Sequence, residues 1–254
     1  MQVDRGRGIV TMTLSNPAKR NAIPAGAWPE IEAAFREVAR RRDDRCVVLT
    51  GEGDDFSSGA DVTGATPDDL GHPLQAMRSI SGAIDALHAL PQPVIARVAG
   101  VCTGIGLNMA LACDIVIASD DSRFSEIFVR RGLSIDGGGS WSLPRIVGLL
   151  KAKELALLGD IISASEAERM GLVTRVVPRA DLDATVRDLA ARLADGPPLA
   201  LSMTKRLLDQ SAQLTLAQAL EAEAEAQTVN FGTKDTAEAM LAFVERREPR
   251  FQGS

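Results

Sequence analysis

Asp136 stands directly before a run of three glycines, Gly137 to Gly139. A carboxylate can accept and return protons, and glycine lets the surrounding backbone pack closely against such a group. An aspartate in this position could instead cap the N-terminus of a helix that follows it. The local pattern leaves both interpretations open, so Asp136 is a candidate acid/base whose role depends on its surroundings.

Two loops that contain glycines could supply peptide N–H groups to the same chemistry. Residues 49–62 and residues 98–110 each run from the end of a strand-like segment through glycines into apolar residues. Two N–H donors that converge on one carbonyl oxygen form an oxyanion hole, and a donor at the start of a helix gains from the helix dipole. Taken singly, each pattern is more typical of a turn. Neither loop has the spacing of a dinucleotide fingerprint or of a P-loop.

The segments around these loops predict an α/β core. Short β-branched runs favour strands, and the stretches between them show apolar residues at helical spacing. The expected strands cover residues 9–14, 46–50, 94–98, 115–118 and 173–177. Helices are expected over residues 31–38 and 74–87, and Ser163 with Glu166 matches a capping box before a short helix that ends near Gly171.

After residue 196 the strand pattern disappears. The turn at residues 195–198 is followed by three helical stretches at about 199–209, 216–230 and 235–246. Gly and Pro in such a turn are typical of a boundary between structural units. We therefore predict two parts, a core of residues 1–196 and a helical region of residues 197–254.

Composition excludes several classes of protein. Lys and Arg number 28 against 34 Asp and Glu, the net charge is −6, and there is no basic tract, which argues against nucleic acid as a partner. No apolar run approaches about 18 residues, so no membrane span is expected, and the N-terminus shows no signal-peptide pattern. Three cysteines without a C-x-x-C pair and two histidines predict no metal site and a reducing, cytoplasmic environment.

Several stretches together resemble the enoyl-CoA hydratase/isomerase family, also called the crotonase superfamily. The similarity extends over nearly the whole chain and is strongest to the branch of 3-enoyl-CoA isomerases and ring-epoxide phenylacetyl-CoA isomerases. The stretches that carry it are residues 16–22, 56–62, 96–118, 123–124, 132–145, 163–171 and 242–251.

The resemblance implies a fold, a ligand and an assembly. The fold would be α/β, a crotonase (ClpP-like) spiral of repeated strand-strand-helix units with a C-terminal helical region that mediates oligomerisation. The partner would be an acyl-CoA thioester, with coenzyme A carried by the substrate and no permanently bound cofactor or metal. The C-terminal helices would assemble a homotrimer or a dimer of trimers.

The resemblance also implies the positions of the site residues. The oxyanion hole would consist of the peptide N–H groups of Ala60 and Ile105, which lie in the two glycine loops. The residues that would bind the coenzyme A part are Lys19, Arg20, Ser58, Gly59, Asp61, Gly104 and, from a neighbouring subunit, Phe251.

Two departures from the family decide which reaction is expected. Hydratases of the family hold glutamates at the places occupied here by Asn108 and Phe128, and neither of these can exchange a proton as a carboxylate does. The isomerase branch places an aspartate before the glycine cluster, as Asp136 is here. The resemblance therefore favours an isomerase that shifts a 3-enoyl-CoA double bond to 2-enoyl-CoA, with Asp136 as the acid/base.

Two alternatives stay open. One is an enoyl-CoA hydratase of low activity that uses Asp136 or Glu126 with a bound water. The other is a non-catalytic member of the family that binds acyl-CoA. Glu126 itself is expected to make a structural hydrogen bond or to face solvent.

The acyl group is not defined by the sequence. The side chains that would select it lie in residues 63–74 and 127–141, and His72 and His88 are expected to be solvated or structural.

Overall fold

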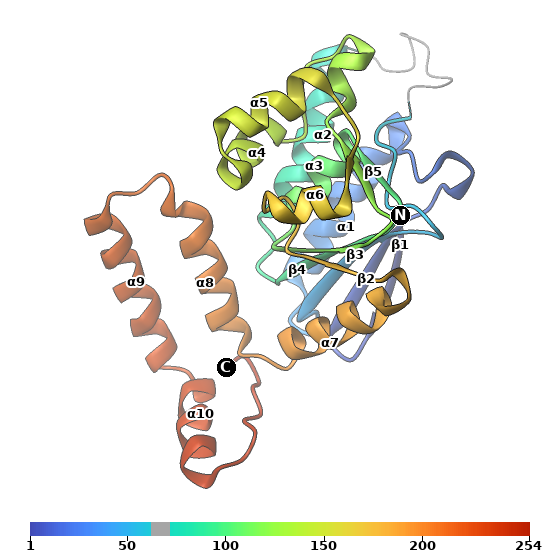
Figure 1. The fold of residues 1–254 in the computed structure, drawn as a ribbon. Coiled ribbons are helices and arrows are strands. Elements are labelled where there is room, and N and C mark those ends of the chain that lie inside the picture. The colour runs from blue at the N-terminus through green and yellow to red at the C-terminus, as the bar shows by residue number, and fades with distance from the viewer. Residues whose placement is uncertain (62–71) are drawn as a thin grey trace.

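The computed structural model describes residues 1–61 and 72–254 (Figure 1). Its main element is a six-stranded sheet with the strand order β1-β2-β3-β4-β6-β9. The edge strand β1 is antiparallel to β2, and all the other neighbours in this sheet are parallel. The bounds are β1 (Gln2–Gly6), β2 (Ile9–Leu14), β3 (Cys46–Gly51), β4 (Val94–Val98), β6 (Ile115–Ser119) and β9 (Arg175–Val177).

A second sheet of three short strands gives the chain its spiral path. It consists of β5 (Val101–Thr103), β7 (Arg123–Ser125) and β8 (Ile162–Ser163) in the order β5-β7-β8. The chain passes from β4 directly to β5, and from β6 directly to β7, so these two turns of the spiral each contribute one strand to each sheet. An isolated bridge from Ser57 to Cys102 extends the second sheet to the loop after β3. The loops between the two sheets are therefore brought side by side.

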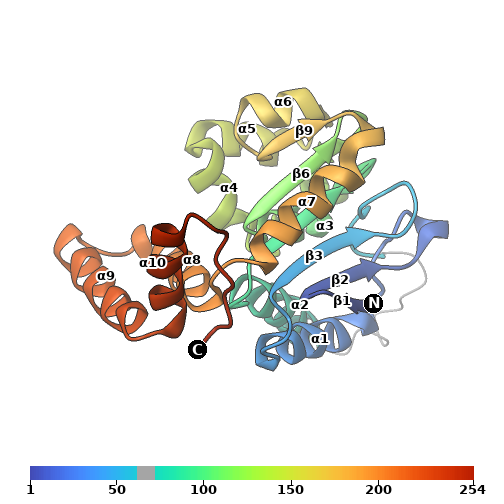
Figure 2. The same cartoon turned by 90° about the horizontal axis from the view of Figure 1, so that it is seen from below.

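Helices cover both faces of the large sheet (Figure 2). Helices α1 (Trp28–Arg40), α2 (Pro73–His88) and α3 (Ile105–Leu111) lie on one side, and α7 (Leu182–Ala194) packs on the other. The sequence of β3 is continuously apolar because both of its faces are buried. Val47 and Leu49 belong to the core on the side of α1 to α3, and Cys46 and Val48 belong to the cluster beneath α7. Parallel strands buried on both faces have this pattern.

Three helices lie between β7 and β9 in the chain, with β8 between the second and the third. They are α4 (Gly139–Val147), α5 (Leu149–Leu158) and α6 (Ala164–Arg169). The predicted capping box is present at α6, where the Ser163 side chain accepts from the Glu166 N–H and the Glu166 side chain accepts from the Ser163 N–H. Gly171 follows that helix with φ of +78°, as its sequence position predicts.

The last three helices stand apart from the sheet (Figure 1). They are α8 (Pro198–Ser211), α9 (Leu216–Phe231) and α10 (Lys234–Glu245). The C-terminal tail folds back on them, because the Asp235 carboxylate accepts hydrogen bonds from the N–H groups of Gln252 at 2.7 Å and Gly253 at 2.9 Å. No strand among the described residues follows β9, as the sequence predicts, whereas the division into two parts at residue 196 stays a prediction.

The elements that the sequence analysis missed include two regular helices, α5 and α7, and several that are short, polar or interrupted. Strand β1 is exposed along its whole length, and β5, β7 and β8 have two or three residues each. Helix α4 contains Pro144, and β9 begins two residues later than expected. Short 3-10 turns complete the described structure: η1 (Pro17–Lys19), η2 (Ala25–Ala27), η3 (Ile127–Arg131) and η4 (Arg179–Asp181).

Candidate active site

One cavity of about 360 Å³ gathers most of the residues that the sequence analysis selected. It lies where the loop after β3, the start of α3, the turn η3 and the segment before α4 meet. Eight of the ten predicted site residues line it: Lys19, Ser58, Gly59, Ala60, Asp61, Gly104, Ile105 and Asp136. Arg20 and Phe251 do not.

The two glycine loops are fixed to each other beside this cavity. The Thr103 N–H donates to the Ser57 carbonyl at 3.0 Å, and the Thr103 hydroxyl donates to the Ser58 carbonyl at 3.2 Å. Gly104, with φ of 56° and ψ of −130°, turns the chain from β5 into α3, and this conformation is essentially restricted to glycine. The two predicted loops therefore lie side by side at the cavity.

The peptide N–H groups of Ala60 and Ile105 are available to a ligand. Ile105 is the first residue of α3, so its N–H has no partner within the helix. Within residues 1–61 and 72–254, neither N–H donates a hydrogen bond to another group. Both residues line the cavity, which places two donors from different loops at its wall.

Asp136 is not a helix cap. Helix α4 has Gly138 at its N-cap position and no side-chain cap hydrogen bond, so the capping interpretation is wrong. The Asp136 Oδ1 atom is buried and has no hydrogen-bond partner among the described residues. Burial raises the pKa of this carboxyl group from 3.8 to about 6. A carboxylate with higher basicity is better suited to removing a proton from carbon.

A second carboxyl group lies beside Asp136. Glu126 is only 2% exposed, and its Oε2 atom accepts a hydrogen bond from Asn108 Nδ2 at 3.4 Å. Burial, followed by the charge of Asp136, raises the pKa of Glu126 to about 8, although the Asn108 hydrogen bond opposes the shift. The expected structural hydrogen bond is present, and Glu126 does not face solvent. Phe128, at the place of a hydratase glutamate, is an apolar wall of the cavity.

The residues expected to bind coenzyme A divide into two groups. Lys19 Nζ lies 2.6 Å from the Asp61 carboxylate, and the Ser58 hydroxyl donates to the Lys19 carbonyl at 2.9 Å, so these residues form one rim of the cavity. Arg20 lies outside the lining and points its exposed guanidinium toward Asp55, 3.9 Å away. Arg131 on η3 lines the cavity and was not predicted. Its only signal in the sequence is a cation directly before Gly132.

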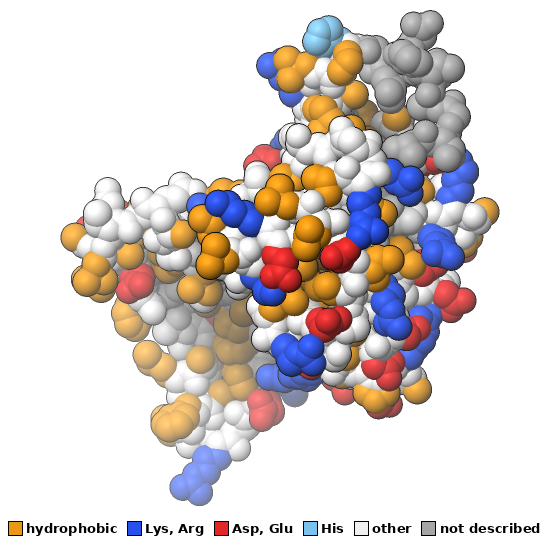
Figure 3. All heavy atoms as spheres, turned by 45° about the horizontal axis from the view of Figure 1, so that its top comes forward, with side chains coloured by type: hydrophobic (Ala, Val, Ile, Leu, Met, Phe, Trp, Pro, Cys, Tyr) orange, Lys and Arg blue, Asp and Glu red, His pale blue; other side chains and the backbone are white. Residues whose placement is uncertain are grey.

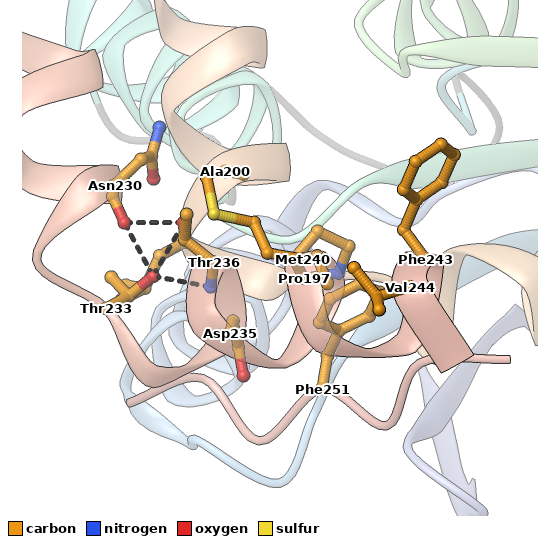
Figure 4. Close-up of a pocket in the computed structure, with 12 residues that line it drawn as sticks. Pro197, Ala200, Asn230, Thr233, Asp235, Thr236, Met240, Phe243, Val244 and Phe251 are labelled. Atoms are coloured by element: carbon orange, nitrogen blue, oxygen red, sulfur yellow. Dashed lines mark hydrogen bonds between the residues drawn. The ribbon is translucent and has the colours of Figure 1, made fainter. Parts of the chain in front are cut away.

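Phe251 lies in a different pocket, among the C-terminal helices (Figure 4). Pro197, Met240 and Val244 line the same pocket, and at its other end Thr233 and Thr236 hydrogen-bond to each other and to the Asn230 carbonyl. The fold of one chain therefore does not bring Phe251 to the cavity that holds Asp136.

The histidines take structural positions. His72 caps α2, where its Nδ1 atom accepts from the Leu74 N–H, and His88 contacts the Trp141 ring edge-on. Residues 63–71 of the segment expected to select the acyl group lie outside the described residues.

The surface carries both signs of charge. Basic and acidic side chains are intermingled over the face shown in Figure 3. Among the described residues there is no group of three or more His, Cys, Asp or Glu that could hold a metal ion, and no helix there is long and apolar enough to span a membrane.

Comparison with known proteins assigns the chain to a family. Residues 4–254 match the model of the enoyl-CoA hydratase/isomerase family. The chain therefore belongs to this family, and its fold is the crotonase fold.

Individual relatives carry the names of two activities. The "Probable enoyl-CoA hydratase" of Rhodobacter capsulatus is 37% identical over 246 residues, which cover 97% of this chain and 95% of the relative. The 1,2-epoxyphenylacetyl-CoA isomerase of Escherichia coli is 35% identical over 254 residues, which cover 97% and 96%. The solved enoyl-CoA hydratase of Bacillus anthracis superposes with a TM-score of 0.94 at 30% identity, covering 100% of this chain and 99% of that one.

Proposed function

We propose that this member of the family is an acyl-CoA isomerase that moves a double bond from C3–C4 to C2–C3 of an enoyl thioester. The observation that carries the proposal is the cavity itself. It combines two peptide N–H groups with one carboxylate, Asp136, and it has Phe128 at one of the two places where hydratases of the family hold glutamates. Asn108, at the other place, donates a hydrogen bond to the main-chain carbonyl of Asp136.

The first step is removal of a proton from C2. The negative charge that develops moves to the thioester oxygen, where the N–H groups of Ala60 and Ile105 stabilise it. The loss of one such donor in a comparable site costs about 2.7–4 kcal/mol. The two donors therefore make a weakly acidic carbon reactive toward a carboxylate base.

The second step returns the proton at C4. One carboxylate can serve both carbons, so Asp136 takes the C2 proton and delivers it to C4 of the dienolate. Burial raises the pKa of Asp136 to about 6, so it is ionised at neutral pH but more basic than an exposed aspartate. Hydration would in addition require a water held and activated at C3.

Replacement of the base tests this assignment. Asp136→Asn should lower kcat for conversion of 3-enoyl-CoA by a factor of about 100 to 10,000, because a neutral amide cannot accept the proton. Binding of the CoA ester, measured by calorimetry, should be largely retained. Asp188→Asn on α7, outside the cavity, is the matched control and should behave like the unchanged protein.

The outcomes separate the candidate functions. Undiminished turnover by Asp136→Asn would remove Asp136 as the base. Tight binding of CoA esters of several acyl lengths without any turnover by the unchanged protein would instead favour a non-catalytic binding role.

The second candidate function is hydration of a 2-enoyl-CoA. The observation in its favour is the Glu126 carboxyl group next to Asp136, because hydration divides its proton transfers between two acids. Product analysis with 3-enoyl-CoA and 2-enoyl-CoA distinguishes the two, since a hydratase releases a 3-hydroxyacyl product and an isomerase does not.

We also propose that Lys19 and its loop hold the phosphates of the CoA ester, which enters as part of the substrate. A cation on the cavity rim has suitable chemistry for a phosphate.

For the assembly we propose a homotrimer or a dimer of trimers formed through the C-terminal helices. Its support is the set of exposed apolar residues on those helices, among them Phe231, Phe243 and Val244.

A further inference from the structure

Three buried oxygen atoms without partners gather behind the cavity. They are Asn108 Oδ1, Glu126 Oε1 and Asp136 Oδ1. Among the described residues only five buried side-chain polar atoms lack a hydrogen bond, so most of them are in this one place. Buried polar atoms are normally paired, and a concentration of unpaired ones marks a functional position.

The Asn108 side chain connects the two carboxyl groups. Its Nδ2 atom donates to the main-chain carbonyl of Asp136 at 2.8 Å and to Glu126 Oε2 at 3.4 Å. Asn108 is 1% exposed, so its amide has no solvent to exchange with. The amide thus fixes the start of the glycine segment on one side and Glu126 on the other.

The groups that face Glu126 do not stabilise the ionised form of its carboxyl group. Asp136 faces it from the segment before α4, and the Cys102 thiol faces it from β5, with the pKa of Cys102 raised by burial so that this thiol stays neutral. Arg130 on the neighbouring turn η3 forms an ion pair with Asp160, and both side chains are about half exposed. Among the described residues, no cation contributes to the pKa of Glu126.

Two carboxyl groups in one desolvated cluster cannot both ionise easily. The pKa of Asp136 lies at about 6 and that of Glu126 at about 8. Asp136 therefore ionises first, and its charge then opposes the ionisation of Glu126. Around neutral pH the cluster carries one negative charge, and Glu126 retains an O–H that can donate to one of the unpaired oxygens.

We propose that Glu126 is a positioning residue, held as a neutral acid behind Asp136, and that the site works only while the pair carries a single charge. The proposal rests on the isomerase function. A second negative charge in this low-dielectric cluster would repel the charge that develops on the thioester oxygen. A neutral acid avoids that repulsion and keeps its hydrogen bond to Asn108.

The pH dependence of kcat/KM tests the charge state. With 3-enoyl-CoA the unchanged protein should show a rise through about pH 6 and a fall above about pH 8. Glu126→Gln keeps an acceptor for Asn108 but cannot ionise, so it should keep the rise and lose the fall. One pH unit above the pKa of Glu126, activity relative to the value at pH 7 should be roughly tenfold higher in Glu126→Gln than in the unchanged protein.

The matched control is Glu30→Gln, a change in an exposed glutamate of α1. It should preserve both limbs of the profile. An alkaline fall that persists unchanged in Glu126→Gln overturns the proposal, because a merely structural hydrogen bond would not move this limb.

Infrared spectroscopy of the carboxyl groups tests the same charge state without activity. At about pH 7 the unchanged protein should show a protonated carboxyl band, and Glu126→Gln should lack most of it. In Asp136→Asn the band should disappear at lower pH, because the opposing charge is gone. This second variant decides the question even if Glu126→Gln does not fold.

The two proposals fail in different ways. Absence of isomerisation by the unchanged protein at every pH overturns the proposed function, whereas a Glu126 band that is absent at neutral pH overturns the neutral acid alone.

Discussion

The surroundings of Asp136 and the C-terminal helices depart from ordinary burial in opposite directions. Around Asp136, polar atoms are buried without partners, as the Glu126 and Asn108 side chains show. On α9 and α10, apolar side chains are exposed instead, and Phe231 and Phe243 are 69% and 85% accessible. Both arrangements cost free energy in an isolated chain.

The two regions therefore suit different kinds of partner. Unpaired polar atoms inside a cavity suit a small molecule that brings its own polar and reacting groups. Exposed apolar side chains on a set of helices suit another protein surface. The apolar residues of the large sheet, in contrast, are buried on both faces.

The largest effect is expected at the cavity, for the substitution Gly104→Ala. The φ of 56° with ψ of −130° is unfavourable for alanine, so the Ile105 N–H should shift away from the thioester oxygen. Loss of one donor predicts a fall in kcat of about 100- to 1,000-fold, measured with 3-enoyl-CoA.

Gly26→Ala provides the control, because a Cβ there meets no atom within 4 Å. A Gly104→Ala protein that is folded by circular dichroism and keeps activity within threefold of Gly26→Ala would contradict the oxyanion role.

A second prediction concerns the free energy of unfolding. The pKa of Glu126 is raised from 4.5 to about 8, so between these values the folded protein holds a proton that the unfolded chain has released. Its contribution to stability is therefore lost as pH rises through this window. The free energy of unfolding of Glu126→Gln, taken relative to that of the unchanged protein, should therefore rise between pH 5 and pH 8 by on the order of 3 kcal/mol.

Urea unfolding at pH 5 and pH 8 measures this difference. Glu30→Gln should show no such pH-dependent change. An equal difference between Glu126→Gln and the unchanged protein at both pH values would mean that Glu126 ionises normally.

The main strands and most of the cavity lining could be predicted from the sequence because their signals are local. Continuous apolar runs such as residues 46–50 mark buried parallel strands, and glycines mark the loops that approach each other. The family resemblance then selected Ala60, Ile105 and Asp136 among the many residues in those loops. All three line one cavity, while their roles stay predictions.

The features that could not be predicted from the sequence arise from contacts between different segments of the chain. Glu126 and Asp136 are ten positions apart, and only the fold shows that Asn108 from a third segment joins them. The same holds for Arg131, whose cation faces the cavity without any motif around it. Phe251 is the converse case, since a single chain places it among α8 to α10 rather than at the cavity.

The smallest effect is expected at the exposed apolar residues of the C-terminal helices. Phe243 and Val244 on α10 are 85% and 77% exposed, which is unusual for neighbouring large apolar residues. Phe243→Ser should weaken the proposed trimer by about 1.5–3 kcal/mol for each buried ring, and the assembly should dissociate at a higher protein concentration. Light scattering over a dilution series measures the mass.

The control for this variant is Val3→Ser on the edge strand β1, where the valine is 36% exposed. It removes apolar surface from the sheet rather than from the C-terminal helices, so it should leave the dissociation curve unchanged. If both variants dissociate alike, the exposed residues of α10 are not the interface. If the unchanged protein is already a monomer at micromolar concentration, the proposed assembly is wrong, and the exposed rings need another partner.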